Sequence, residues 1–144
     1  MNPKSRQIFL AIAILSLVGI AISSVSLYHH YDKSESSFCD FGGSFNCDIV
    51  NRSIYSTVFG VPVALIGVLG YAGLLGLATI HRSNKETPKI LLAASLVGLG
   101  FALYLTYIEG FVLAAWCALC LASLSVISSI AVLSGVLMVF RNQD

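Results

Sequence analysis

The last apolar run of the chain, residues 111–140, reads FVLAAWCALCLASLSVISSIAVLSGVLMVF. It holds no charged residue, and as a helix it exceeds the roughly 20 residues needed to cross ~30 Å of hydrocarbon. Two cysteines, Cys117 and Cys120, stand near its start. The run therefore predicts a membrane span that carries a pair of thiols at one end.

The composition of the whole chain is that of a membrane protein. Of 144 residues, 57% are hydrophobic and 10% are charged, and the mean hydropathy is +0.88, which is too apolar for a soluble domain. We expect an all-α bundle of four transmembrane helices that forms a single membrane domain over residues 1–144. The predicted spans are residues 8–28, 58–81, 88–108 and 111–140, with an outer loop at residues 29–57. A signal peptide is the alternative for the first run, although its apolar core is longer than usual.

Basic residues are distributed unevenly along this four-span arrangement. All except Lys33 and Arg52 fall on one side of it. By the positive-inside rule we expect both termini in the cytoplasm and all four cysteines toward the extracytoplasmic side. A tight turn around Glu109 and Gly110 then joins the third and fourth spans outside. The net charge of +1 gives no indication of a nucleic-acid partner.

The outer loop holds the other two cysteines, Cys39 and Cys47. The outer side of a bacterial plasma membrane is oxidising enough for disulfides to persist. Cys117 and Cys120 share a helix face and can be bridged once the first turn adapts. Because backbone N–H groups at a helix start favour a thiolate, we expect Cys117 to be the thiol that exchanges.

Depth in the membrane separates the roles of the helix cysteines, because Cys120 lies about 4.5 Å further along the axis than Cys117. This suggests a relay that passes electrons from an external dithiol to Cys39 and Cys47, then to Cys117 and Cys120, and then to a quinone in the lipid. Each step between cysteine pairs is attack of a thiolate on a disulfide. Two alternatives are a structural zinc site, for which no histidine cluster is present, and a non-enzymatic membrane protein with structural disulfides.

Two segments, CDIVNRSIYSTVFGVPVALIGVLGY at residues 47–71 and YLTYIEGFVLAAWCALCLAS at residues 104–123, resemble the vitamin K epoxide reductase family, closest to its prokaryotic branch. The resemblance implies a four-helix bundle around a quinone pocket, capped by the loop and a short half-helix. It implies that Cys47 attacks Cys117, that Cys39 pairs with the external partner and that Cys120 meets the quinone. The co-substrate would be a menaquinone, ubiquinone or phylloquinone, with no metal.

The resemblance also suggests quinone-binding residues outside the cysteine pairs. Ser53 takes a polar role near the quinone, and Ser56 is placed to donate a hydrogen bond to a quinone oxygen. Phe59, just above Pro62, either lines the ring pocket or fills the bundle. Leu124 stands where the vertebrate enzymes have a tyrosine, which favours quinone reduction coupled to disulfide formation over reduction of the vitamin K epoxide, the alternative activity.

Many prokaryotic relatives carry a fused thioredoxin-like domain, whereas this chain ends at Asp144. We therefore expect a separate thioredoxin-like extracytoplasmic redox protein as the partner. The expected location is the prokaryotic plasma membrane, with the chain as a multi-pass integral protein in the lipid bilayer.

Overall fold

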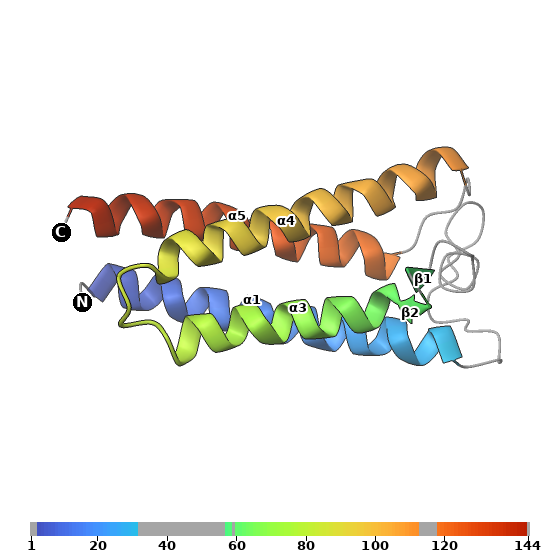
Figure 1. The fold of residues 1–144 in the computed structure, drawn as a ribbon, viewed down its shortest axis with the longest axis horizontal. Helices are drawn as coiled ribbons and strands as arrows, with labels where there is room; N and C mark the ends of the chain where they lie inside the picture. The colour runs from blue at the N-terminus through green and yellow to red at the C-terminus, as the bar shows by residue number, and fades with distance from the viewer. Residues whose placement is uncertain (1–2, 32–56, 59, 113–117, 144) are drawn as a thin grey trace.

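The computed structural model describes residues 3–31, 57–58, 60–112 and 118–143. Within these ranges the long helices are α1 (Pro3–Tyr31), α3 (Val63–Thr79), α4 (Thr87–Tyr107) and α5 (Ala118–Gln143). Successive helices run in opposite directions along one bundle (Figure 1). The start of α1, the α3–α4 connection and the end of α5 therefore share one end, which we call the terminal end (residues 3–6, 80–89 and 141–143). The other end, the hairpin end, holds residues 57–58, 60–62, 108–112 and 118–120.

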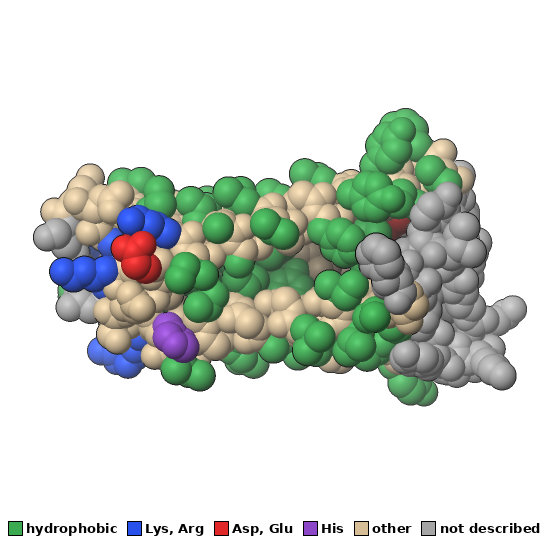
Figure 2. Space-filling view, viewed as in Figure 1, with side chains coloured by type: hydrophobic (Ala, Val, Ile, Leu, Met, Phe, Trp, Pro, Cys, Tyr) green, Lys and Arg blue, Asp and Glu red, His purple; other side chains and the backbone are tan. Residues whose placement is uncertain are grey.

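The described helices have the length and composition of a membrane bundle. Three segments are long and apolar enough to cross a membrane: Pro3–Tyr28, Thr87–Val112 and Ala118–Gln143. The helix α3 is apolar but shorter, at 17 residues. Large apolar side chains such as Leu10, Leu69, Val97 and Val132 are exposed on the outside of the bundle, as the green patches along Figure 2 illustrate. Such a surface suits lipid and not water, so the prediction of an all-α membrane bundle is confirmed.

A short hairpin precedes α3. The strands β1 (Thr57–Val58) and β2 (Val61–Pro62) pair antiparallel, with Thr57 opposite Pro62 and Val58 opposite Val61. Gly60 in the turn has a φ of 80°, a conformation that glycine adopts at little cost. The second span was predicted from residue 58, but the helix begins at Val63, because Pro62 is still extended, with a ψ of 134°.

The connection after α4 also differs from the expected outer turn. The chain continues from α4 into a π-helical turn, η2 (Ile108–Val112), and α5 begins at Ala118 and not at Phe111. The wider π turn changes which side chains face the bundle. Glu109 is only 1% exposed, whereas Phe111 is 79% exposed and packs its ring against Tyr107 with 5.0 Å between centroids. The prediction of a tight turn around Glu109 and Gly110 is therefore wrong, because both residues belong to the π-helical turn.

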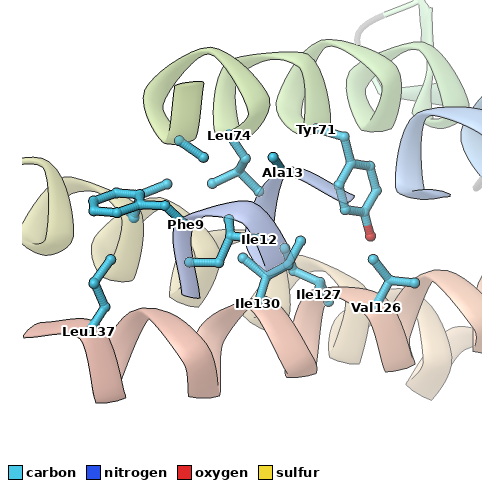
Figure 3. Packing of buried hydrophobic residues seen from close by; sticks show 11 residues of the cluster. Phe9, Ile12, Ala13, Tyr71, Leu74, Val126, Ile127, Ile130 and Leu137 are labelled. Atoms are coloured by element: carbon cyan, nitrogen blue, oxygen red, sulfur yellow. The ribbon is translucent and has the colours of Figure 1, made fainter. Parts of the chain in front are cut away.

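The helices do not all pack equally closely. The helix α1 packs along both α3 and α5, and α4 packs along α5, whereas α3 and α4 meet far less. The buried hydrophobic core consists of Phe9, Ile12, Ala13, Tyr71, Leu74, Ala78, Leu91, Val126, Ile127, Ile130 and Leu137 (Figure 3). Phe9, Leu91 and Leu137 come from the terminal-end turns of their helices. The core therefore fills mainly the terminal half of the bundle.

Two glycines allow α1 and α3 to approach closely. A Cβ atom added at Gly19 would lie 2.4 Å from Cδ1 of Tyr71, and one added at Gly67 would lie 2.7 Å from Oγ of Ser23. Both distances are too short for any side chain larger than hydrogen. Small residues at helix contacts are the usual means of close packing in membranes, where no hydrophobic effect draws helices together.

The terminal end gathers the basic residues. Every lysine and arginine that the structure describes lies there, as the blue groups in Figure 2 illustrate. One of them ties two elements together, because Nη1 of Arg141 at the end of α5 donates a hydrogen bond to the carbonyl oxygen of Arg82, 3.1 Å away, in the α3–α4 connection. In that connection the backbone N–H of Glu86 donates to Oδ1 of Asn84 at 3.1 Å, which shapes the turn.

Candidate functional site

A cavity of about 490 Å³ lies in the half of the bundle toward the hairpin end. All the described helices contribute to its wall, with η2 at its outer edge. Its volume falls within the roughly 300–1,000 Å³ typical of small-molecule sites, and its lining is mainly apolar. Figure 2 shows the surface hollowed along the line where α4 faces α3. The site therefore lies where these two helices meet least.

Several small residues of α3 and α4 line the cavity. These are Gly67, Gly70, Ala94 and Gly98. A Cβ atom added at Gly70 would find nothing within 4 Å. Aromatic and branched side chains close the rest of the wall, among them Phe101 and Leu105 of α4. The space between the helices is thus wide enough for a flat ring and offers it apolar contacts.

Few polar side chains of the described residues reach this apolar wall. They are Ser23, Ser26, Tyr71, Glu109, Cys120 and Ser123. Cys120 is the predicted site residue among them. It is half-buried and lies in the first described turn of α5. A sulfur atom therefore faces a cavity that an apolar molecule can occupy.

Tyr71 and Ser123 form a polar pair across the cavity wall. Oη of Tyr71 donates a hydrogen bond to the carbonyl oxygen of Ser123 at 3.0 Å and lies 2.8 Å from its Oγ. Figure 3 shows the Tyr71 ring pointing from α3 toward α5. Ser123 lies one turn along α5 from Cys120, about 4.5 Å further into the bundle. The thiol and the hydroxyl pair therefore line the same side of the cavity at different depths.

Glu109 places a carboxyl group in the wall near the hairpin end. It is 1% exposed, and it is the only acidic residue between Glu86 and Asp144. Ionisable side chains within membrane bundles are rare and usually face the protein interior, where they mark functional sites. The burial of Glu109 beside the cavity follows that pattern.

The sequence model of the vitamin K epoxide reductase family matches residues 10–135. The chain belongs to this family. The match runs from the first turns of α1 through most of α5 and includes the whole cavity wall. Family membership identifies the chain as a membrane oxidoreductase of the vitamin K epoxide reductase type and confirms the resemblance seen in the sequence.

The structure places one of the predicted site residues of this family and leaves the others outside its range. Cys120 lines the cavity. The remaining predicted residues, Cys39, Cys47, Ser53, Ser56, Phe59 and Cys117, lie outside the described residues. The hairpin β1–β2, which follows residue 56 in the chain, lies at the same end of the bundle as the start of α5 (Figure 1).

Sequence reasoning missed five polar residues of the described cavity wall: Ser23, Ser26, Tyr71, Glu109 and Ser123. Two of them had a readable signal. Tyr71 is the only aromatic residue of α3, and Glu109 is an isolated acid within an apolar stretch. Ser123 had no such signal, because α5 carries many serines and only the packing of the helices shows which of them meets Tyr71.

Proposed function

We propose that this chain is a thiol-disulfide oxidoreductase that passes electrons from an extracytoplasmic dithiol protein to a membrane quinone. The electrons enter at Cys39 and Cys47 and move to Cys117 and Cys120. At each exchange one S–S bond forms as another opens. At the last step two thiols lose two electrons and two protons to form one disulfide, and the quinone takes up both pairs to become the hydroquinone.

The observation that carries this proposal is the position of Cys120 on the wall of an apolar cavity. A volume of about 490 Å³ accommodates a quinone ring with part of its substituents. The small residues along α3 and α4 leave a gap suited to a flat aromatic molecule, and a few polar groups are present to orient its oxygens. These features favour a quinone over a charged or strongly hydrated substrate.

The weak contact between α3 and α4 supports entry of the quinone from the lipid. The cavity is lined from both helices, and its lining includes the exposed apolar side chains of Ile66 and Val97. An isoprenoid tail can lie between the two helices and extend into the bilayer while the ring meets Cys120. A water-soluble acceptor would have to cross an apolar surface to reach the same thiol.

The outer wall of the quinone site is assigned to the segment that leads into the hairpin. Ser53 and Ser56 supply polar contacts, and Phe59 supplies a ring face. Support comes from β1, which begins at Thr57 and lies at the same end of the bundle as the start of α5 (Figure 1). The external partner is a thioredoxin-like protein that exchanges with Cys39.

The orientation in the membrane follows from charge. All described lysines and arginines lie at the terminal end, whereas Cys120 lies toward the hairpin end. The positive-inside rule therefore places the terminal end, with both termini, in the cytoplasm and the cysteines toward the outside of a prokaryotic plasma membrane. This is the side on which disulfides persist.

Quinone reduction by the purified protein in detergent tests the proposal. Reduced thioredoxin is the electron donor and decylubiquinone or menadione is the acceptor, with the rate of the protein-free mixture subtracted. We expect Cys120→Ala to lower turnover at least about a hundredfold, because no disulfide can form at the quinone. Ser125→Ala is the matched control, since this exposed serine lies on the same helix and donates only to the carbonyl of Leu121, 3.1 Å away.

Two results would contradict the proposal. Full turnover by Cys120→Ala would show that the Cys120 thiol is not needed to reduce the quinone. Failure of the folded native protein to reduce either quinone would instead favour structural disulfides or another acceptor.

A further inference from the structure

Three helices converge on one polar pair at the inner part of the cavity. Gly19 of α1 leaves room for the Tyr71 ring of α3, and Tyr71 Oη meets both the carbonyl oxygen and the Oγ of Ser123 on α5, at 3.0 and 2.8 Å. Tyr71 is 5% exposed and lines the cavity together with Ser123. The arrangement requires a glycine on α1, a phenol on α3 and a hydroxyl on α5.

Ser123 differs from the neighbouring serines of α5 in its hydrogen bonding. The hydroxyls of Ser125, Ser128 and Ser129 each donate to the carbonyl four residues earlier, at 3.1, 2.7 and 2.9 Å. This back-bond is the ordinary way for a serine to satisfy its hydroxyl in an apolar helix. The Ser123 hydroxyl pairs with Tyr71 instead, and either oxygen can be the donor. The hydroxyl therefore has a partner outside its own helix.

Proton counting shows what this pair can do. A phenol has one hydrogen to donate, and Oη of Tyr71 lies within reach of two acceptors on Ser123. When Tyr71 donates to the carbonyl, the Ser123 hydroxyl donates to Tyr71. When Tyr71 donates to Oγ, the hydrogen of Ser123 becomes available to a molecule in the cavity. The carbonyl still accepts its helical bond from the backbone N–H four residues later, so the second arrangement leaves no group unsatisfied.

We propose that Ser123 donates a hydrogen bond to a carbonyl oxygen of the bound quinone and that Tyr71 positions the Ser123 hydroxyl for this contact. The inference rests on the proposed quinone site and adds two residues to it. Cys120 and Ser123 lie one helical turn apart, about 4.5 Å along the axis. A ring lying along this face of α5 can meet the sulfur with one edge and the hydroxyl with an oxygen.

The contact has a consequence for reduction. As the quinone takes up electrons, negative charge develops on its oxygens, and a hydrogen bond to an ionised acceptor is stronger than one to a neutral carbonyl. A donor fixed in advance in an apolar cavity stabilises that charge without reorganisation. Ser123 is thus a binding residue whose contribution increases during reduction, and Tyr71 acts through it.

Equilibrium dialysis of oxidised menadione against detergent-matched buffer gives the first test. We expect Ser123→Ala to bind menadione about two- to tenfold more weakly, the range expected for one lost hydrogen bond. Tyr71→Phe keeps the ring against Gly19 but lets Ser123 return to the back-bond of its neighbours, so a smaller loss is expected. Ser125→Ala and Tyr104→Phe are the matched controls; Tyr104 is 56% exposed on α4, and both should bind like the native chain.

A double variant and a vibrational spectrum distinguish positioning from a general structural role. If Tyr71 acts through Ser123, the double variant Tyr71→Phe, Ser123→Ala should bind no more weakly than Ser123→Ala alone. Menadione labelled with ¹³C at one carbonyl or the other should show one carbonyl stretch lowered in frequency when bound to the native chain. Ser123→Ala should return that band to its frequency in detergent.

The outcomes separate this inference from the proposed function. Binding of menadione by the native chain, with additive losses or with no carbonyl band altered by Ser123→Ala, would overturn the role of the pair while leaving the quinone site standing. Failure of the native chain to bind menadione at all would overturn the quinone site and the inference with it.

Discussion

Replacing Gly19 with alanine should destabilise the bundle through a single methyl group. The added Cβ would lie 2.4, 2.5 and 2.6 Å from Cδ1, Cε1 and Cγ of Tyr71. Carbon atoms in contact are normally about 3.5–4.0 Å apart, so the ring or the whole of α1 must move by about 1 Å. The ring cannot simply rotate aside, because its Oη is held by Ser123 on α5.

The expected cost follows from these contacts. Extra carbon in a well-packed core typically costs about 1–3 kcal/mol. Displacement of Tyr71 also weakens its hydrogen bonds to Ser123, and a typical bond of this kind contributes about 1 kcal/mol. We therefore expect Gly19→Ala to lower the free energy of unfolding by about 2–4 kcal/mol, which corresponds to a fall in the apparent Tm of roughly 5–15 °C.

Thermal stability in detergent measures this effect. Aliquots are heated for a fixed time, and the fraction that remains monodisperse is read by size-exclusion chromatography, because membrane proteins often unfold irreversibly. Gly73→Ala is the matched control, since a Cβ atom there would meet nothing within 4 Å. It should leave the apparent Tm unchanged or raise it slightly, because alanine favours a helix more than glycine does.

Repeating the substitution in a variant without the Tyr71 ring tests whether contact with this ring causes the loss of stability. In Tyr71→Ala the ring is absent, so adding Gly19→Ala should cost far less than it does in the native chain. The reasoning would be refuted if Gly19→Ala were as stable as Gly73→Ala, or if its cost were the same with and without the Tyr71 ring.

Two further predictions test the cavity and the orientation. Gly70→Leu puts a branched side chain into the cavity, where an added Cβ meets nothing within 4 Å, so the KM for decylubiquinone should rise about tenfold or more with little change in apparent Tm. Gly73 lies outside the cavity wall, so Gly73→Leu should leave this KM unchanged. Equal effects of the two variants on the KM would contradict the proposed site. A green fluorescent protein fused after residue 144 should fluoresce, and an alkaline phosphatase fused there should be inactive, because the positive-inside rule places this end in the cytoplasm. An inactive fluorescent protein with an active phosphatase would show that the chain has the opposite orientation.

The helices themselves could be read from the sequence to a useful degree. The first and third predicted spans, residues 8–28 and 88–108, lie within or nearly within α1 and the α4–η2 segment. Their apolar runs are uninterrupted and end in charged or polar residues, so composition alone marks them. The second and fourth began later than predicted. Val58 and Pro62 belong to a hairpin, and Phe111 belongs to η2, because strand pairing and a π turn depend on contacts that hydropathy does not register.

The candidate site was readable in part. Cys120 was identified because a pair of cysteines in an apolar span is chemically conspicuous, and the structure places it in the cavity wall. Glu109 was expected in a tight turn between the third and fourth spans. Its burial depends on the π-helical turn that follows α4.

The sequence by itself determined that the chain is a membrane protein, that most of its basic residues fall on one side of the predicted spans and that a pair of cysteines stands near the start of the last apolar run. These properties follow from composition and order along the chain, since the transfer of side chains to lipid is nearly additive. Only the tertiary structure decided that α3 and α4 stay apart around a cavity and that Tyr71 meets Ser123 from a distant helix. The reason is that a cavity depends on how side chains of several helices fill space together, and no single helix carries that information.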